Sequence, residues 1–297
     1  MKWIELEIFT TLAASEAVTN ILTEFGIEGL SKERPADSSS EAQIIIKAYL
    51  ADNQSSIKKI TEIEERIKDL PAYGIDITPG KVAFERILAE DWHTSWQQHF
   101  KPRQITEKLA IKPTWADYQP SNDQQVIELD PGRAFGTGLH ATTTMCLEAI
   151  EEYSLGRESL LDLGSGTGIL SIAAALLGME KVLAVDIDEV AVEAAKENIE
   201  LNGVQNKVEV RQGSLTKEVD EKFDLVVANI LPHIIWELIA DLKQVLAENS
   251  LFILSGINIE KKSKLQKRLK EFELTIMKIK EREDWVTFIG QRGESNG

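Results

Sequence analysis

The sequence predicts an α/β fold in which a small α+β domain precedes a doubly wound, Rossmann-like sheet. Three observations favour this fold. From about residue 107 onward, apolar strands alternate with amphipathic helices, a pattern typical of a mostly parallel sheet with helices on both faces. Within that part, 158–168 reads ESLLDLGSGTG, an apolar run that breaks into alternating glycines. The first 80 residues follow a different order of elements.

Residues 1–88 are expected to form a ferredoxin-like domain. Apolar residues alternate from Ile4 to Ile8, which predicts a strand, and recur at helical spacing from Ile57 to Ile67, which predicts a helix. The expected order is strand, helix, strand, strand, helix, strand, at 2–9, 15–25, 27–31, 42–49, 55–70 and 74–78. This βαββαβ order favours a ferredoxin-like unit. Since it carries no catalytic motif, we expect it to recognise a substrate or a partner, or to be purely structural.

A tryptophan-rich linker, 89–105, is expected between the domains. If it is helical, Trp92, Trp96, His99 and Phe100 fall on one face, because residues three and four apart are neighbours on a helix. This face is expected to pack against the second domain or to receive substrate. His93 and His99 have no acid or cysteine at metal-ligand spacing, so no metal site is expected.

The second domain is expected to span 106–297. Its predicted strands lie at 108–113, 125–130, 159–162, 181–186, 207–212, 223–228, 250–255, 273–280 and 285–291. Its predicted helices lie at 142–153, 169–177, 189–202, 232–246 and 260–272. The last two strands are expected to form an antiparallel edge. In a sheet of this kind the ligand lies at the carboxyl ends of the parallel strands.

The glycine loop predicts a site for a nucleotide cofactor. Gly164, Gly166 and Gly168 allow the backbone to approach a ligand without interference from a Cβ, and they supply φ angles that other residues avoid. Asp186, 22 residues after Gly164, ends the strand-like run KVLAVD. Its carboxylate can accept hydrogen bonds from both hydroxyls of a ribose. Together these residues predict a cofactor that contains adenosine.

The spacing of the loop favours S-adenosyl-L-methionine over NAD. A dinucleotide fingerprint reads GxGxxG, whereas this loop reads DxGxGxG and has Ile169 after Gly168. S-adenosylmethionine has no phosphate and needs no anion cradle. Asp162, just before the loop, could face the ammonium or sulfonium of that cofactor. We therefore expect a class I S-adenosylmethionine-dependent methyltransferase domain, with a plain glycine-rich turn as the alternative.

Two further segments are expected near the same edge of the sheet. In PGRAFGTGLHATTT, the hydroxyls of Thr142, Thr143 and Thr144 could reach the cofactor or cap a helix, and Phe135 could form an apolar wall. In VVANILPHII, Asn229 follows a buried strand. Its amide oxygen could orient an amine nucleophile, or the residue could cap the next helix. The sequence offers no residue that we would assign as a general base.

In their order and spacing, DPGRAFGTGLHATT, LDLGSGTGIL, VDID and ANIL resemble the methyltransferase family of ribosomal large-subunit protein eleven. The resemblance covers nearly the whole chain. It implies methylation of lysine side chains and of the N-terminal amine of that ribosomal protein, free of the ribosome or at its stalk base, with the small domain recognising the substrate. Carried over by position, the cofactor contacts of the family fall on Thr143, Gly164, Asp186 and Asn229. Where the family pattern has a threonine before the histidine and a proline after it, this chain reads GTGLHATT.

Composition narrows the class of substrate. A net charge of −16 repels phosphate backbones, so no direct nucleic-acid binding is expected; the acidity either attracts a basic protein or serves solubility. No apolar run reaches membrane-spanning length, and the single Cys146 suits the reducing cytoplasm. Two other functions remain open: a related methyltransferase that modifies lysine in another protein, and an adaptor that binds the cofactor without transfer.

Overall fold

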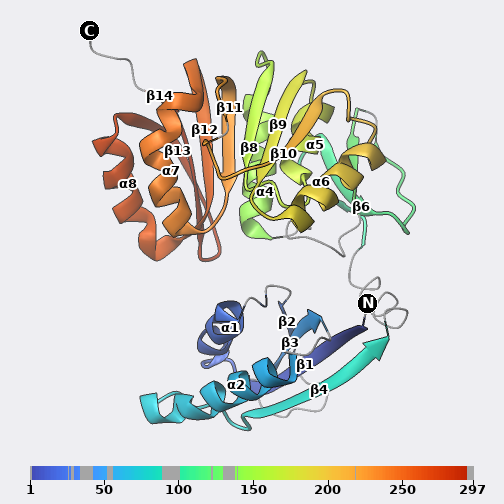
Figure 1. Ribbon diagram of the computed structural model, residues 1–297, viewed down its shortest axis with the longest axis vertical. Coiled ribbons are helices and arrows are strands. Elements are labelled where there is room, and N and C mark those ends of the chain that lie inside the picture. Colours follow the sequence, from blue (N-terminus) through green and yellow to red (C-terminus); the bar gives the residue numbers. More distant parts are fainter. Residues whose placement is uncertain are drawn as a thin grey trace. The chain divides into compact units, whose positions relative to one another are not determined.

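The computed structural model describes residues 2–25, 27, 30–33, 43–51, 56–88, 101–121, 123–129, 138, 140–217 and 219–292. The chain divides into two compact units, Met1–His99 and Phe100–Gly297, and Figure 1 shows the elements of each. The predicted linker helix falls largely on residues 89–100, which lie outside the described ranges. None of the helices in the described ranges combines the length and apolar character needed to cross a membrane.

The N-terminal unit contains one antiparallel sheet with the strand order β2-β3-β1-β4. In chain order its elements are β1 (Lys2–Thr11), α1 (Ser15–Glu24), β2 (Leu30–Glu33), β3 (Gln43–Ala51), α2 (Ser56–Asp69) and β4 (Lys81–Leu88). The alternation in β1 works as expected, because Ile4, Leu6 and Ile8 are fully buried and share a core with both helices. The elements follow one another in the βαββαβ order that the sequence predicts.

The prediction of a strand at 74–78 is wrong. After α2 the chain forms a 3₁₀ turn, Leu70–Tyr73, with Pro71 near its start, and Gly74 leaves the turn with a φ of 81°. Pro79 and Gly80 come directly before β4, and Gly80 has a φ of 65°. Proline lacks the N–H that a sheet ladder requires, so pairing starts only at Lys81. The strand itself, β4, pairs antiparallel with β1 along its whole length.

The second unit contains a seven-stranded sheet with the order β10-β9-β8-β11-β12-β14-β13, which confirms the doubly wound fold. The first five strands are parallel, and β12, β14 and β13 pair antiparallel, as expected. The strands are β8 (Ser159–Leu163), β9 (Lys181–Asp186), β10 (Val208–Gln212), β11 (Phe223–Asn229), β12 (Leu246–Asn258), β13 (Leu274–Arg282) and β14 (Trp285–Arg292).

Helices cover both faces of this sheet (Figure 1). One core lies under α4 (Ala141–Tyr153), α5 (Ile169–Leu176) and α6 (Glu189–Leu201). The other lies under α7 (Pro232–Val245) and α8 (Lys262–Glu271). Successive residues along each strand point into opposite cores. Leu160 and Ala184 belong to the first core, and Leu161 and Leu183 belong to the second. This burial on both faces explains why the strands read as continuous apolar runs.

The first two strands predicted for this unit do form, but they do not join the large sheet. They are β6 (Leu109–Pro113) and β7 (Gln125–Leu129), which pair parallel in a separate three-stranded sheet with β5 (Arg103–Gln104). Asn202, which ends α6, holds this small sheet: its side chain donates to the Glu128 carbonyl at 2.7 Å and accepts from the Glu128 amide at 2.8 Å. The small sheet therefore packs over the first core.

Candidate active site

The carboxyl ends of four parallel strands meet at one edge of the large sheet. The glycine loop leaves β8, Asp186 ends β9, and Asn229 ends β11. Asn229 lies in register with Ser255 on β12. Ligands of doubly wound sheets bind at this edge, because the loops there diverge to either face. The structure therefore brings the residues predicted from three separate motifs to one place.

The glycine loop has the backbone conformation that glycine alone adopts readily. Gly164, Gly166 and Gly168 have φ values of 73°, 53° and 78°. At Gly164 an added Cβ would lie 2.2 Å from Cγ2 of Ile230, a side chain that follows β11. Glycine is therefore favoured at this position for two independent reasons, the backbone angle and the close approach of the Ile230 side chain.

Asp186 holds the glycine loop. Its Oδ2 accepts from the Gly166 amide at 2.8 Å, and its Oδ1 accepts from the Asp188 amide at 3.0 Å. Because each carboxylate oxygen has two lone pairs, both oxygens keep capacity for a further donor. Asp186 is only partly buried. The acid that the sequence singles out thus shapes the loop and presents a carboxylate beside it.

Asp162 lies buried on β8, directly before the loop. Its Oδ2 accepts from the Ser171 hydroxyl at 2.7 Å, whereas its Oδ1 has no hydrogen-bond partner within the described ranges. The pKa of this carboxyl is raised to about 7, mainly by burial and also by the charge of Asp186, while the hydrogen bond from Ser171 lowers it. A buried acid with one unpartnered oxygen beside the loop is suited to a cationic ligand group.

Thr143 and Asn229 are in contact. Thr143 lies in the first turn of α4 and is 1% exposed. Asn229 donates from Nδ2 to Thr143 Oγ1 at 3.3 Å. Its Oδ1 accepts no hydrogen bond from the described part of the chain and is left for another donor. The sequence indicates each residue separately, but only the fold shows that they form a pair.

The cap of α4 differs from the expectation that Thr142, Thr143 or Thr144 caps this helix. The residue that caps the helix is His140, whose Nδ1 accepts from the Thr142 amide at 3.4 Å and lies 2.7 Å from the Thr142 hydroxyl. Its ring packs edge-on against Trp285, with centroids 5.0 Å apart. Thr144 donates back to the His140 carbonyl at 3.2 Å. Of the three threonines, Thr143 is the one in contact with Asn229.

Sequence reasoning missed Ser255 and Thr287. Both are fully buried, and their hydroxyl oxygens lie 2.7 Å apart beneath α4. Ser255 ends the predicted strand 250–255 as a polar residue after an apolar run, a signal that could have found it. Thr287 gives no such signal. The predicted wall residue, Phe135, lies outside the described residues.

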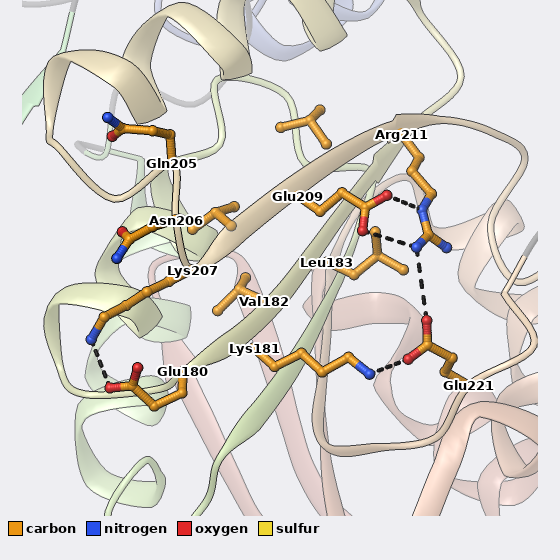
Figure 2. Close-up of a pocket in the computed structure, with 12 residues that line it drawn as sticks. Glu180, Lys181, Val182, Leu183, Gln205, Asn206, Lys207, Glu209, Arg211 and Glu221 are labelled. Atoms are coloured by element: carbon orange, nitrogen blue, oxygen red, sulfur yellow. Dashed lines mark hydrogen bonds and ion pairs between the residues drawn. The ribbon is translucent and has the colours of Figure 1, made fainter.

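A hollow of about 460 Å³ lies elsewhere on the sheet, near the beginnings of β9 and β10. Figure 2 shows the residues that line it. Its lining cations pair with carboxylates: Lys207 with Glu180, Lys181 with Glu221, and Arg211 with Glu209. The glycine loop does not line it. We therefore place the candidate site at the opposite, carboxyl edge.

Comparison with known proteins assigns the chain to a family. The family model "Ribosomal protein L11 methyltransferase (PrmA)" matches residues 2–293. The ribosomal protein L11 methyltransferase of Anoxybacillus flavithermus is 42% identical over 311 residues, covering 98% of this chain and 100% of the relative. The enzyme of that name from Listeria innocua is 39% identical, with 99% of each chain covered.

A solved structure gives the same family. The crystal structure of a ribosomal protein L11 methylase from Lactobacillus delbrueckii subsp. bulgaricus has a TM-score of 0.63 and 39% identity. It covers 66% of this chain and 100% of its own. Together with the glycine loop and Asp186 at the carboxyl edge, these matches confirm the resemblance predicted from the motifs. The chain belongs to the ribosomal protein L11 methyltransferase (PrmA) family and is an S-adenosylmethionine-dependent protein methyltransferase.

Proposed function

We propose that this enzyme methylates lysine side chains and the N-terminal amine of ribosomal protein L11. One observation supports it most directly: the amide oxygen of Asn229 has no donor within the described ranges and lies at the edge where the glycine loop begins. Such an oxygen can accept a hydrogen bond from an amine. The family relatives, which match this chain over nearly their full length, carry the name of the same substrate.

The residues at the carboxyl edge fit S-adenosylmethionine. Gly164, Gly166 and Gly168 keep the loop free of side chains, and Asp186 offers carboxylate lone pairs for ribose hydroxyls. The unpartnered Oδ1 of Asp162 suits a cationic group. We assign cofactor contacts to these glycines, Asp186, Thr143 and Asn229. When bound, S-adenosylmethionine supplies a methyl group on a positively charged sulfur.

Asn229 would orient the acceptor amine. With Nδ2 engaged by Thr143, its Oδ1 can accept an N–H and align the nitrogen lone pair. A free lysine has a pKa near 10.4, so its neutral form costs about 4.6 kcal/mol at pH 7. Desolvation in the site lowers this cost, and the proton leaves to water. No general base is assigned: His233 is exposed in the first turn of α7, and His140 caps α4. Phe135 is proposed as a wall of the pocket.

The N-terminal unit is proposed to recognise the protein substrate, either free of the ribosome or at its stalk base. The site residues all lie in the second unit, which leaves the first without a catalytic role. The net charge of −16 favours a basic protein and disfavours direct contact with nucleic acid. This proposal places the enzyme in the cytoplasm.

Transfer of a labelled methyl group tests the proposal. The enzyme is incubated with labelled S-adenosylmethionine and either purified ribosomal protein L11 or a lysate of cells that lack this enzyme. We expect label on L11 in both samples, at lysine side chains and the N-terminus by mass spectrometry. Label on another protein indicates the related lysine methyltransferase, and no label indicates a binding protein that transfers nothing.

A further inference from the structure

Two hydroxyl groups form a chain of hydrogen bonds beneath the first turn of α4. Ser255 donates from Oγ to the main-chain carbonyl of Thr142 at 3.3 Å, and its oxygen lies 2.7 Å from Oγ1 of Thr287. In the contact between the two hydroxyls, either oxygen could be the donor. The chain begins on β14, passes through β12 and ends on the backbone of α4.

The hydroxyls of Ser255 and Thr287 lie at positions where aliphatic side chains would be expected from packing alone. Their neighbours two residues away on the same faces are Ile253 and Ile289, both fully buried in the core under α4. A buried hydroxyl is unfavourable unless it has a partner, so the two residues must be kept together. They occur at the end of the sheet nearest the candidate site and act on the helix that carries Thr143.

Ser255 touches both parts of the Thr143–Asn229 contact. Its hydroxyl holds Thr142, the residue before Thr143. Its carbonyl accepts from the amide of Ile230, the residue after Asn229, at 3.3 Å. One serine is therefore hydrogen-bonded to the residue before Thr143 and to the residue after Asn229.

We propose that Ser255 and Thr287 are positioning residues for methyl transfer. By fixing the first turn of α4, they keep Thr143 against Nδ2 of Asn229, so that Oδ1 stays turned toward the acceptor amine. This inference rests on the proposed function, because it assigns the two hydroxyls a role in that reaction.

The test compares hydroxyl deletions with a matched control. Ser255→Ala and Thr287→Val each break the chain of hydrogen bonds, and Thr287→Ser keeps a hydroxyl at position 287. Ser250→Ala is the control. Ser250 lies at the other end of β12, is 1% exposed and also donates to a backbone carbonyl, that of Ala247 at 2.7 Å. We expect kcat for L11 methylation to fall about tenfold in both deletions. Thr287→Ser and Ser250→Ala should keep kcat within about twofold of the unmodified chain.

Two further readouts separate positioning from general loosening. The affinity for S-adenosylhomocysteine should fall by a smaller factor than kcat does in Ser255→Ala, because the glycine loop and Asp186 are untouched and only the contacts of Thr143 and Asn229 change. All rates are measured well below the thermal midpoint of each variant, since Ser255→Ala leaves the buried Thr287 hydroxyl without this partner. In an Asn229→Ala background, Ser255→Ala should lower the single-turnover rate no further, since it acts through Asn229.

Three results would overturn the inference. One is a kcat for Ser255→Ala and Thr287→Val no lower than that of Ser250→Ala. Another is a full additional loss from Ser255→Ala when Asn229 is already alanine. The third is Thr287→Ser behaving like Thr287→Val. If the unmodified enzyme methylates no L11, the proposed function is wrong, and the positioning role fails with it. If the unmodified enzyme methylates L11 and one of the three results above is found, only the positioning role is wrong.

Discussion

At the scale of single residues, two carboxylates beside the glycine loop have different environments. Asp186 is partly exposed and accepts from two backbone amides, whereas Asp162 is buried with one oxygen unpartnered within the described ranges. The motif DxGxGxG contains Asp162 and the run KVLAVD ends with Asp186, so both acids could be found in the sequence. Their protonation could not, because the pKa of Asp162 depends on burial under α5.

The raised pKa of Asp162 predicts a pH-dependent stability. Its value is about 7 in the folded chain, against an ordinary value of 3.8. Between these values the folded state binds more protons than the unfolded state. The contribution of this group to the free energy of unfolding therefore falls as pH rises from about 4 to about 7, and is constant above. Asp162→Asn removes this dependence, so the variant should gain stability relative to the unmodified chain as pH rises through this window.

Urea unfolding at several pH values between 4 and 8 measures this gain. The difference in the free energy of unfolding between the variant and the unmodified chain should change by at most about 1.4 kcal/mol per pH unit, the limit for one proton. A difference that is independent of pH would show that Asp162 is ionised throughout the window in the folded enzyme.

At the scale of elements, the strands and helices of the large sheet follow from periodicity, while their pairing depends on contacts far apart in sequence. Periodicity places β6 and β7 correctly but cannot show that they form a separate sheet held by Asn202. The apparent strand at 74–78 fails because Pro79 and Gly80 delay pairing. Likewise, the Ser255–Thr287 contact joins strands 32 residues apart and leaves no local pattern.

The glycine loop predicts a difference between two glycine-to-alanine changes. Gly164 and Gly203 have similar positive φ values, 73° and 67°, but an added Cβ meets Ile230 at 2.2 Å in the first and nothing within 4 Å in the second. Gly203→Ala should lower the free energy of unfolding by about 1 kcal/mol, the cost of the backbone angle alone. Gly164→Ala should cost more and should also weaken cofactor binding, because Ile230 or the loop must move.

Chemical unfolding and calorimetry with S-adenosylhomocysteine check both variants. If Gly164→Ala binds that ligand as tightly as Gly203→Ala does, close approach of the backbone at Gly164 is not part of the binding site.

At the scale of the whole molecule, the two units are expected to have separate roles: the second binds the cofactor and the first recognises the protein substrate. The residues assigned to the cofactor lie in the second unit. Deleting residues 1–88 should therefore leave cofactor binding unchanged and stop methylation of L11. Calorimetry and labelled-methyl transfer on the truncated chain measure the two outcomes. Retained methylation would remove the recognition role of the N-terminal unit.

The central claim is that the carboxylate of Asp186 holds the ribose of S-adenosylmethionine at the glycine loop. Asp224 provides the control, since its carboxylate also accepts from two backbone amides, those of Glu158 and Ser159 at 3.0 Å, but at the opposite end of the sheet. Calorimetric titration with S-adenosylhomocysteine should give tight binding to the unmodified chain and to a folded Asp224→Ala variant, and no measurable binding to Asp186→Ala. Equal binding by all three chains would contradict the account.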